Sequence, residues 1–402
     1  MGDVSLEADA LLYRGKFMER TDAWVICAGR GEDKAPTQLT RETWLLSACA
    51  PEEALVEPLY GCWEANMTHA LQRTPIDVAR QRGEDRVVLG NCGLVRILRP
   101  AENSSLREGD LCIIGNGALL DRFGYPTQVW GYDWPRSMGF LAKRAKVHSD
   151  ILVRIPSPTR FSLIQWASFG VRYATAYSNW QVAYPCFRSQ VSAEDLPRPF
   201  VWGWGGGSSL AGLHLARLLG FPAAMLTSHP ARQRLLTQMG IQAIDRRAFG
   251  DLSFQEERFA RDGEYRRRYR ESEQAFADFV NQATDGLGVS IFFDYLGSSV
   301  LRATLRALGR QGVLSTAGWK HGPALSILRS LECLRRHIHV HTHYCRRGHV
   351  QAAMNFAEQT GWMSPIEPDE PVWSFDQIDA LAKGYADEKI NTYFPIYQVN
   401  PL

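Results

Sequence analysis

Residues 200–220 read FVWGWGGGSSLAGLHLARLLG, and this stretch decides the fold. The apolar run FVWGWG predicts a buried strand, and the run that follows predicts an amphipathic helix over 209–219. The turn between them is rich in glycine, which lets the backbone turn tightly and approach a phosphate closely. A strand, such a turn and a helix form the unit that binds a dinucleotide pyrophosphate, so we expect that ligand here rather than a purely structural turn. The expected contacts are Gly203, Gly205, Gly206, Gly207, Ser208 and Ser209.

The second strand of this unit indicates which dinucleotide binds. It ends in LTSHPARQR, residues 226–234, where no Asp or Glu is present to bind the ribose 2′-hydroxyl of NAD. Ser228, His229 and Arg232 instead offer hydrogen-bond donors and positive charge, which suit the 2′-phosphate of NADP. Ser228 also fits as the cap of a helix that begins at Pro230, and both interpretations can hold together. NADPH is therefore the expected cofactor.

The rest of the C-terminal half alternates apolar runs with amphipathic ones. Predicted strands lie at PAAMLTS (222–228), AIDRR (243–247), SIFFDYLG (290–297) and GVLSTAG (312–318), with a helix over 230–239. Strands that alternate with helices form a parallel sheet with right-handed crossovers, so we expect a doubly wound α/β domain. The mixed-charge segment 246–273 predicts solvated helix faces, and the alternative is a rim that helps to hold a phosphorylated ligand.

The N-terminal half has a different texture. Residues 1 to about 45 are polar and mixed, and AGRGEDKAPT (28–37) predicts a surface loop. Short β-type runs follow over 52–115, at spacings typical of an antiparallel barrel or sandwich. A helical pattern over 161–183 leads into the α/β half. The sequence thus predicts a mostly β domain followed by an α/β domain.

Length, charge and cysteine content limit the number of domains and the classes of function that this chain can have. The chain has 402 residues, for which two or three domains are the ordinary expectation, and the pattern above favours two. Its 45 Lys+Arg and 43 Asp+Glu leave a net charge of +2, which argues against nucleic-acid binding. The 8 Cys form no CxxC pair, and no leader or apolar run of membrane-spanning length is evident. We therefore expect a cytoplasmic protein with reduced thiols and no membrane contact.

Four stretches, in this order, carry a resemblance to a known family: PEEALVEPLYGCWEANMTHAL (51–71), QVWGYDWPRSMGFLAKRAKV (128–147), WASFGVRYATAYSNW (166–180) and LRRHIHVHTHY (334–344). Together with the glycine-rich turn they resemble the medium-chain dehydrogenase/reductase superfamily, and within it crotonyl-CoA carboxylase/reductase. The resemblance implies a GroES-like β-rich catalytic domain over 1–180, completed by about 345–402. It implies a Rossmann NADPH-binding domain over 181–344.

The resemblance also implies an activity. It is the NADPH-dependent reduction of an α,β-unsaturated acyl thioester of CoA or a carrier protein, with hydride delivered to the β-carbon and CO2 as a further substrate if the α-carbon is carboxylated. Two alternatives remain open: a diverged, zinc-independent member that acts on another small carbonyl compound, and a catalytically silent NADPH-binding protein. A homodimer or homotetramer is expected.

The resemblance places candidate catalytic residues in the β-rich half. Tyr132 and Asp133 in WGYD match an aromatic residue and a Glu that organise the CO2 pocket, but Asp is one methylene shorter, which puts carboxylation in doubt. The alternative is that Asp133 only caps a turn before Pro135. Asn66 is matched to a CO2-contacting Asn, whereas an alignment without gaps places Glu64 at that position.

The run HIHVHTHY supplies the candidate active-site histidine. As a strand it directs the imidazoles of His337, His339, His341 and His343 to one face. Such spacing suits zinc, but no Cys or acidic partner has ligand spacing, so we expect no metal. His343, followed by an aromatic residue, fits the family's active-site His better than His341, which a count without gaps selects.

The remaining candidates concern the nicotinamide end of the cofactor. Thr175 belongs to a Thr-Ala-Tyr that the resemblance places beside the cofactor. Gly297 and Gly318 fall where the chain is expected to pass near the nicotinamide ring, although each is also an ordinary turn glycine. Ser209 stands where many relatives carry a third glycine, and we expect it to weaken cofactor binding.

Overall fold

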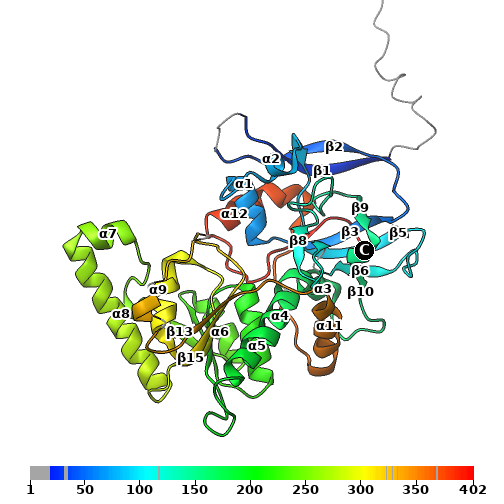
Figure 1. Cartoon of the computed structure of the whole chain (residues 1–402). Helices are drawn as coiled ribbons and strands as arrows, with labels where there is room; N and C mark the ends of the chain where they lie inside the picture. Colours follow the sequence, from blue (N-terminus) through cyan, green and yellow to red (C-terminus); the bar gives the residue numbers. More distant parts are fainter. Residues whose placement is uncertain are drawn as a thin grey trace, which may run out of the picture.

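The structure is a computed structural model that describes residues 19–30, 35–115, 118–322, 324–327, 329–332, 334–367 and 370–402. Part of the predicted loop at 28–37 and residues 1–18 of the polar N-terminal stretch lie outside these ranges, as does Cys333. The described parts of the loop, 28–30 and 35–37, contain no helix or strand. Figure 1 shows a β-rich domain beside an α/β domain, with the C-terminus in the former.

The glycine-rich unit forms as predicted. Strand β11 (Val201–Trp204) runs into helix α5 (Gly207–Leu218) through the glycine turn. The parallel sheet has the order β13-β12-β11-β14-β15-β16, which confirms the doubly wound α/β fold. Its other strands are β12 (Ala223–Thr227), β13 (Gln242–Asp245), β14 (Val289–Phe293), β15 (Leu308–Thr316) and β16 (His339–Thr342).

Alternation along the central strand explains the two helical layers. Val201 belongs to one apolar cluster, together with residues of α4 (Phe169–Arg188) and α5, whereas Trp202 and Trp204 belong to another. The second cluster includes residues of α8 (Gly263–Ala283) and α9 (Ser298–Ala307). Because successive side chains of a strand point to opposite faces, an uninterrupted apolar strand needs a helix layer on both sides.

The β-rich domain is built on a sheet in the order β10-β6-β5-β3-β18-β17, with β9 also paired to β3. The last strand of the chain, β18, is antiparallel to β3, so the C-terminal segment returns to the sheet that the first half builds. Helix α12 (Ile378–Ala386) lies beside α1 (Ala65–Gln72) in the same domain (Figure 1). The sheet strands are β3 (Glu53–Cys62), β5 (Gly93–Arg99), β6 (Leu111–Ile114), β9 (Ala145–His148), β10 (Leu152–Arg154), β17 (Trp373–Ser374) and β18 (Ile396–Gln398).

The smaller elements complete this picture. Strands β7 and β8 form a separate antiparallel pair, and β4 pairs with β1. Their bounds, with those of the remaining helices, are α1 (Ala65–Gln72), α2 (Val78–Arg82), α3 (Leu163–Ala167), α6 (Pro230–Gln238), α7 (Glu256–Arg261), α10 (Arg329–Glu332), α11 (Gly348–Thr360), α12 (Ile378–Ala386), β4 (Arg86–Val87), β7 (Ala118–Leu120) and β8 (Pro126–Val129).

Three local predictions need correction. The polar stretch before residue 45 contains a hairpin of β1 (Glu19–Cys27) and β2 (Thr40–Leu46), in which Trp24 donates to the Phe375 carbonyl at 2.8 Å. The helix expected over 161–183 is divided at Ser168 into α3 and α4. The four histidines do not share one strand, because β16 covers only residues 339–342 and His337 lies in a turn with φ 55°.

The charged segment 246–273 contains α7 and the first half of α8, and these helices lie at the edge of the molecule farthest from the β-rich domain (Figure 1). Exposed i,i+4 pairs such as Arg268–Glu264 and Arg267–Glu271 lie along α8. This arrangement is that of a solvated helix face. In the described part of the chain, no helix is long and apolar enough to cross a membrane.

A buried hydrogen-bond chain fixes the carboxyl end of β14. Trp204 Nε1 donates to Thr304 Oγ1 at 2.6 Å, and the Thr304 hydroxyl donates to Asp294 Oδ2 at 2.8 Å. Asp294 Oδ1 accepts from the backbone N–H groups of Leu296 and Gly297. Burial raises the pKa of Asp294, and these hydrogen bonds oppose that rise. These hydrogen bonds connect helix α9 to strands β11 and β14.

We expect Thr304→Val to destabilise the protein by at least about 2 kcal/mol, because it leaves the Trp204 N–H and one Asp294 oxygen buried without their partner. Urea denaturation measures this change. Thr237→Val, at an exposed position on α6, is the matched control and should change stability by no more than about 0.5 kcal/mol. Equal stability of the two variants would contradict the assignment.

Candidate cofactor and substrate cavities

The first cavity lies at the carboxyl edge of the parallel sheet, where strands β11 and β14 are neighbours and the strand order reverses. This switch point is where doubly wound sheets bind ligands. The cavity has a volume of about 280 Å³. Its lining includes Gly205, Gly206, Gly207, Ser208, Ser228, His229 and Arg232 from the predicted cofactor set, and Glu64 from the predicted catalytic set.

The glycine turn exposes a helix N-terminus to this cavity. Gly206 has φ 151° and is the N-cap of α5, which has no side-chain cap. A Cβ atom on Gly207 would lie 2.5 Å from Arg172 Cδ and 2.9 Å from the Tyr393 carbonyl oxygen, so a larger residue would collide there. Uncapped N–H groups at a helix start carry partial positive charge. The turn can therefore bind an anion through backbone groups alone.

Arg232 contacts the C-terminal segment as well as the cavity. Its Nε donates to the Asn391 carbonyl at 2.9 Å and its Nη2 to the Thr392 carbonyl at 3.3 Å. The guanidinium also lies 4.6 Å from the Tyr393 ring centroid. Arg232 thus holds the C-terminal segment against the α/β domain. His229, in the same lining, has a buried Nδ1 without a hydrogen-bond partner.

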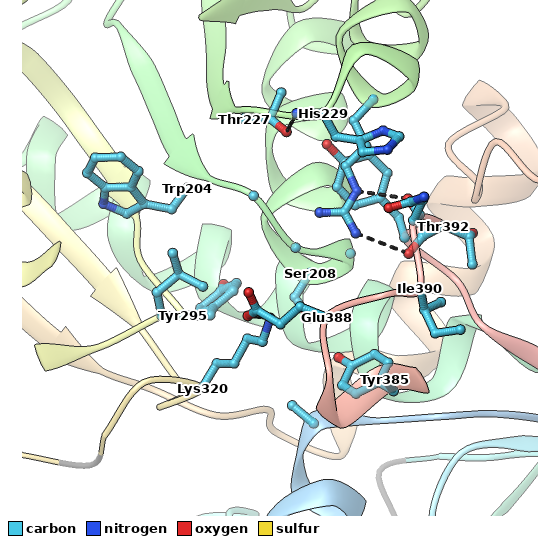
Figure 2. Close-up of a pocket in the computed structure, with 18 of the residues that line it drawn as sticks. Trp204, Ser208, Thr227, His229, Tyr295, Lys320, Tyr385, Glu388, Ile390 and Thr392 are labelled. Carbon is cyan, nitrogen blue, oxygen red and sulfur yellow. Dashed lines mark hydrogen bonds and ion pairs between the residues drawn. The ribbon is translucent and has the colours of Figure 1, made fainter. Parts of the chain in front are cut away.

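Charged residues that the sequence patterns did not single out complete the lining. Lys320 Nζ lies 2.8 Å from Glu388 Oε1, and His321 Nε2 lies 3.6 Å from the same oxygen. Figure 2 shows Lys320 and Glu388 meeting in the cavity. The hydrogen bond and charge of Lys320 lower the pKa of Glu388. Arg246 also lines the cavity, and no other residue of segment 246–273 does.

A buried ion pair forms the inner wall of the first cavity. Arg172 Nη1 lies 2.7 Å from Glu64 Oε1, and its Nη2 donates to the Trp63 carbonyl at 2.8 Å. Arg172 also donates to the Cys62 thiol. Burial raises the pKa of Glu64, while the charge of Arg172 opposes the rise. Arg172 stands three residues before Thr175 on α4, and a charged residue within an otherwise uncharged stretch, residues 161–187, was the available signal.

The second cavity lies at the carboxyl ends of β15 and β16, on the same edge of the sheet. It has a volume of about 290 Å³, and its lining includes Gly318 and His343 from the predicted set, with Thr316, Trp319, Thr342 and Tyr344. Burial, followed by the charges of His349, His341 and Arg346, lowers the pKa of His343 to about 4. His343 is therefore neutral at pH 7.

His343 and Tyr344 are held by their neighbours. His343 Nε2 lies 2.8 Å from the Ser178 hydroxyl, and the Tyr125 ring meets the His343 ring edge-on at 5.4 Å. Burial raises the pKa of Tyr344, with smaller contributions from Cys345 and Glu64. A neutral imidazole and a protonated phenol therefore line this cavity, and both can donate hydrogen bonds.

Several predicted catalytic residues lie outside the linings of both cavities. Asp133 Oδ1 accepts the Val129 N–H at 2.5 Å within the turn after β8, and burial raises its pKa. The Tyr132 side chain is buried, and its carbonyl accepts from Arg82. Asn66 lies in the first turn of α1 with an unpaired, buried Oδ1. His341 lies on β16 with a buried, unpaired Nε2.

The remaining predicted cofactor contacts also lie outside the linings of both cavities. Gly203 is buried within β11, and Ser209 is buried on α5. Gly297 is the N-cap of α9, with φ 95°, where a Cβ would lie 2.5 Å from the Gly322 carbonyl oxygen. Thr175 is buried on α4, and its hydroxyl has no partner. Within the described residues, no group of three or more His, Cys, Asp or Glu side chains is arranged to hold a metal ion.

Comparison with known proteins places this fold. No family model and no curated protein matches the chain. Among solved structures, crotonyl-CoA carboxylase/reductase AntE in complex with NADP is similar with a TM-score of 0.74 and 20% identity, over 94% of this chain and 95% of that one. The 2-octenoyl-CoA carboxylase reductase CinF in complex with NADP and 2-octenoyl-CoA gives 0.73 and 18%, over 94% and 87%. An alcohol dehydrogenase from Thermotoga maritima gives 0.71 and 15%, over 94% and 99%.

These likenesses confirm the predicted fold. The chain shares the fold of these structures, with a GroES-like β-rich domain beside a Rossmann-like parallel-sheet domain. The predicted resemblance to crotonyl-CoA carboxylase/reductase is confirmed as a likeness of fold.

The ion pair between Arg172 and Glu64 predicts a specific pattern of stabilities. Arg172→Leu and Glu64→Leu should each destabilise the protein by about 3–5 kcal/mol, because each leaves the other charge buried and unpaired. The double variant should cost less than the sum of the single ones by at least about 1 kcal/mol. Urea denaturation of all four proteins gives this coupling energy. Additive costs would show that the two charges do not depend on each other.

Proposed function

We propose that this protein is an NADPH-dependent reductase of an α,β-unsaturated acyl thioester. The observation that carries the proposal is the pair of cavities on one edge of the parallel sheet. The first has the donors that a dinucleotide phosphate needs, and the second holds the neutral imidazole of His343. The fold likeness to NADP-bound carboxylase/reductases of enoyl-CoA compounds supports the same conclusion.

The described residues fit NADPH. The N–H groups of Gly207 and Ser208 at the open start of α5 would hold the pyrophosphate. Ser228, His229 and Arg246 would hold the 2′-phosphate beyond the end of β12. One buried, unpaired hydroxyl supports the fit, that of Tyr295 in the first cavity wall. Gly318 lines the second cavity, where the nicotinamide end would lie.

The chemistry divides between the cofactor and the protein. NADPH supplies a hydride, which adds to the β-carbon of the enoyl thioester. Negative charge then develops on the thioester oxygen, and a preorganised donor stabilises it in a site that excludes water. Tyr344 is suited to this task because its raised pKa keeps the hydroxyl protonated. His343, neutral at pH 7, is suited to supply the proton that the α-carbon needs.

We propose simple reduction as the main outcome, with CoA or a carrier protein as the acyl carrier. Asp133, the counterpart of a CO2-organising Glu, uses Oδ1 to cap its own turn, and neither Asp133 nor Asn66 lines the first or the second cavity. Carboxylation by CO2 stays a prediction from the resemblance. The expected homodimer or homotetramer also stays a prediction. Light scattering of the purified protein measures its oligomeric state.

A second candidate is the reduction of another small carbonyl compound. The likeness to an alcohol dehydrogenase, with a TM-score of 0.71, favours it. Both candidates use the same cofactor site and differ in the occupant of the second cavity. A catalytically silent NADPH-binding protein would use the first cavity alone.

The direct test is an assay with NADPH and crotonyl-CoA, with and without bicarbonate. We expect NADPH absorbance to fall and mass spectrometry to show a product heavier than the substrate by two hydrogens. A product that also contains CO2 would show carboxylation. Binding of NADPH without its consumption, across several enoyl thioesters and small carbonyl compounds, would contradict an enzymatic role.

The position of Arg246 predicts how the protein selects NADPH over NADH. Arg246→Ala should weaken NADPH binding about tenfold or more and leave NADH binding nearly unchanged, because only NADPH carries the 2′-phosphate. Isothermal titration calorimetry measures both affinities. Arg247→Ala is the matched control, since Arg247 is exposed, pairs with Asp245 and does not line the cavity. A parallel loss of affinity for NADPH and NADH in Arg246→Ala would remove Arg246 from this role.

A further inference from the structure

Ser178 joins two histidines through one buried hydroxyl. Its Oγ lies 2.8 Å from His343 Nε2 and 2.8 Å from His349 Nδ1. The Arg346 backbone N–H donates to the same oxygen at 3.1 Å. Ser178 is fully buried in α4, whereas His349 is half-buried in the first turn of α11. The three side chains therefore lead from the second cavity, which His343 lines, toward the surface.

Counting protons shows that the two rings are linked. A serine hydroxyl has one proton to donate and two lone pairs to accept with, and the Arg346 N–H occupies one lone pair. If both facing ring nitrogens carried protons, the oxygen would accept three hydrogen bonds. If both were bare, one close contact would lack a proton. One of His343 Nε2 and His349 Nδ1 is therefore protonated and the other is bare.

We infer that Ser178 and His349 form, with His343, a proton relay that supplies the α-carbon of the substrate in the second cavity. The relay rests on the proposed function. His349 and Ser178 act through His343, so they are positioning residues and His343 is the group that meets the substrate. The other ring nitrogen of His343, Nδ1, has no hydrogen-bond partner among the described residues and is free to carry the transferred proton.

The transfer balances in atoms and charge. His349, as a neutral ring, takes a solvent proton at Nε2 as its Nδ1 proton passes to Ser178 Oγ, the Ser178 hydroxyl proton moves to His343 Nε2, and His343 releases its Nδ1 proton. The electron pair of the thioester enolate forms the new C–H bond as the N–H bond at Nδ1 breaks. The negative charge of the enolate and the positive charge of the solvent proton disappear together. A solvent proton that later binds His343 Nδ1 reverses the chain, and His349 Nε2 then releases its proton.

The groups around His343 and His349 are consistent with the roles of these two residues in the relay. Arg346 and His341 face His343 and disfavour a positive charge on it, and the Tyr125 ring covers one edge. His349 faces Arg346 and the Tyr177 ring, and burial also lowers its pKa. His343 needs no charge of its own in the relay, because it only changes tautomer. A proton source built into the cavity wall also competes with CO2 for the enolate, so the relay favours simple reduction.

The first test is nitrogen-15 NMR of the histidine side chains in the protein without ligands. We expect His343 Nε2 and His349 Nδ1 to be in opposite protonation states in the parent protein. Ser178→Ala should abolish this link, and His339→Gln, at a histidine outside the chain, should leave it intact. Identical protonation of the two facing nitrogens in the parent protein would overturn the relay, whether or not the protein is active.

The second test is steady-state kinetics with NADPH and crotonyl-CoA. Ser178→Ala and the non-titrating His349→Gln should each lower kcat about 100-fold, since general acid catalysis contributes about 10²–10⁴. The KM for NADPH should stay within about twofold, because neither residue lines the cofactor cavity. His349→Gln keeps the test available if Ser178→Ala does not fold, and His339→Gln should retain the parent kcat.

Product stereochemistry separates a relay from a structural role. In deuterated water the parent protein should place deuterium on one face of the α-carbon, whereas Ser178→Ala should give a mixture. Unchanged kcat and unchanged stereochemistry in both variants would overturn the relay while leaving the reductase intact. A parent protein that consumes no NADPH with any enoyl thioester would instead overturn the proposed function and the relay's role in it.

Discussion

The buried ion pair between Arg172 and Glu64 is the interaction on which the position of the first cavity's inner wall depends. Arg172 comes from α4, in the middle of the chain, and binds Glu64 and the Trp63 carbonyl of the β-rich domain. Its side chain also occupies the space next to Gly207, so the glycine is needed where helix and turn meet. A charge this deep costs several kcal/mol of desolvation unless it is paired. The pairing therefore fixes where the β-rich domain sits against the cofactor turn.

A second constraint is geometric. All strands of a parallel sheet end at the same edge, so residues far apart in sequence meet there. Gly206 follows β11, Tyr295 follows β14, Gly318 follows β15 and His343 follows β16. The first and second cavities thus lie on one edge of the sheet for a topological reason. Ser178 contacts both His343 and His349. It lies on α4, the helix that also carries Arg172, so one helix supplies both the ion pair with Glu64 and the contact between the two histidines.

The sequence predicts the fold well where local signals agree. The apolar strand, the glycines and the amphipathic helix around Gly206 each indicate the same unit, and the structure has it. The β1–β2 hairpin was missed although its pairing is local, because its strands, ERTDAWVIC and TRETWLL, mix charged and apolar residues. At the site, the strand-end residues could be predicted from spacing. The sequence could not predict the Lys320–Glu388 pair or the Ser178–His349 contact. The partners in each are far apart in the sequence, so no short-range pattern indicates that they lie close together.

The most direct measurement of the central claim is a crystal structure with NADPH bound. The pyrophosphate should lie within hydrogen-bond distance of the Gly207 and Ser208 N–H groups, and the nicotinamide ring should reach Gly318 beside His343. The Arg172–Glu64 pair should remain intact behind the turn. A cofactor bound elsewhere on the protein, or one whose nicotinamide lies at Arg246 and away from His343, would contradict the account.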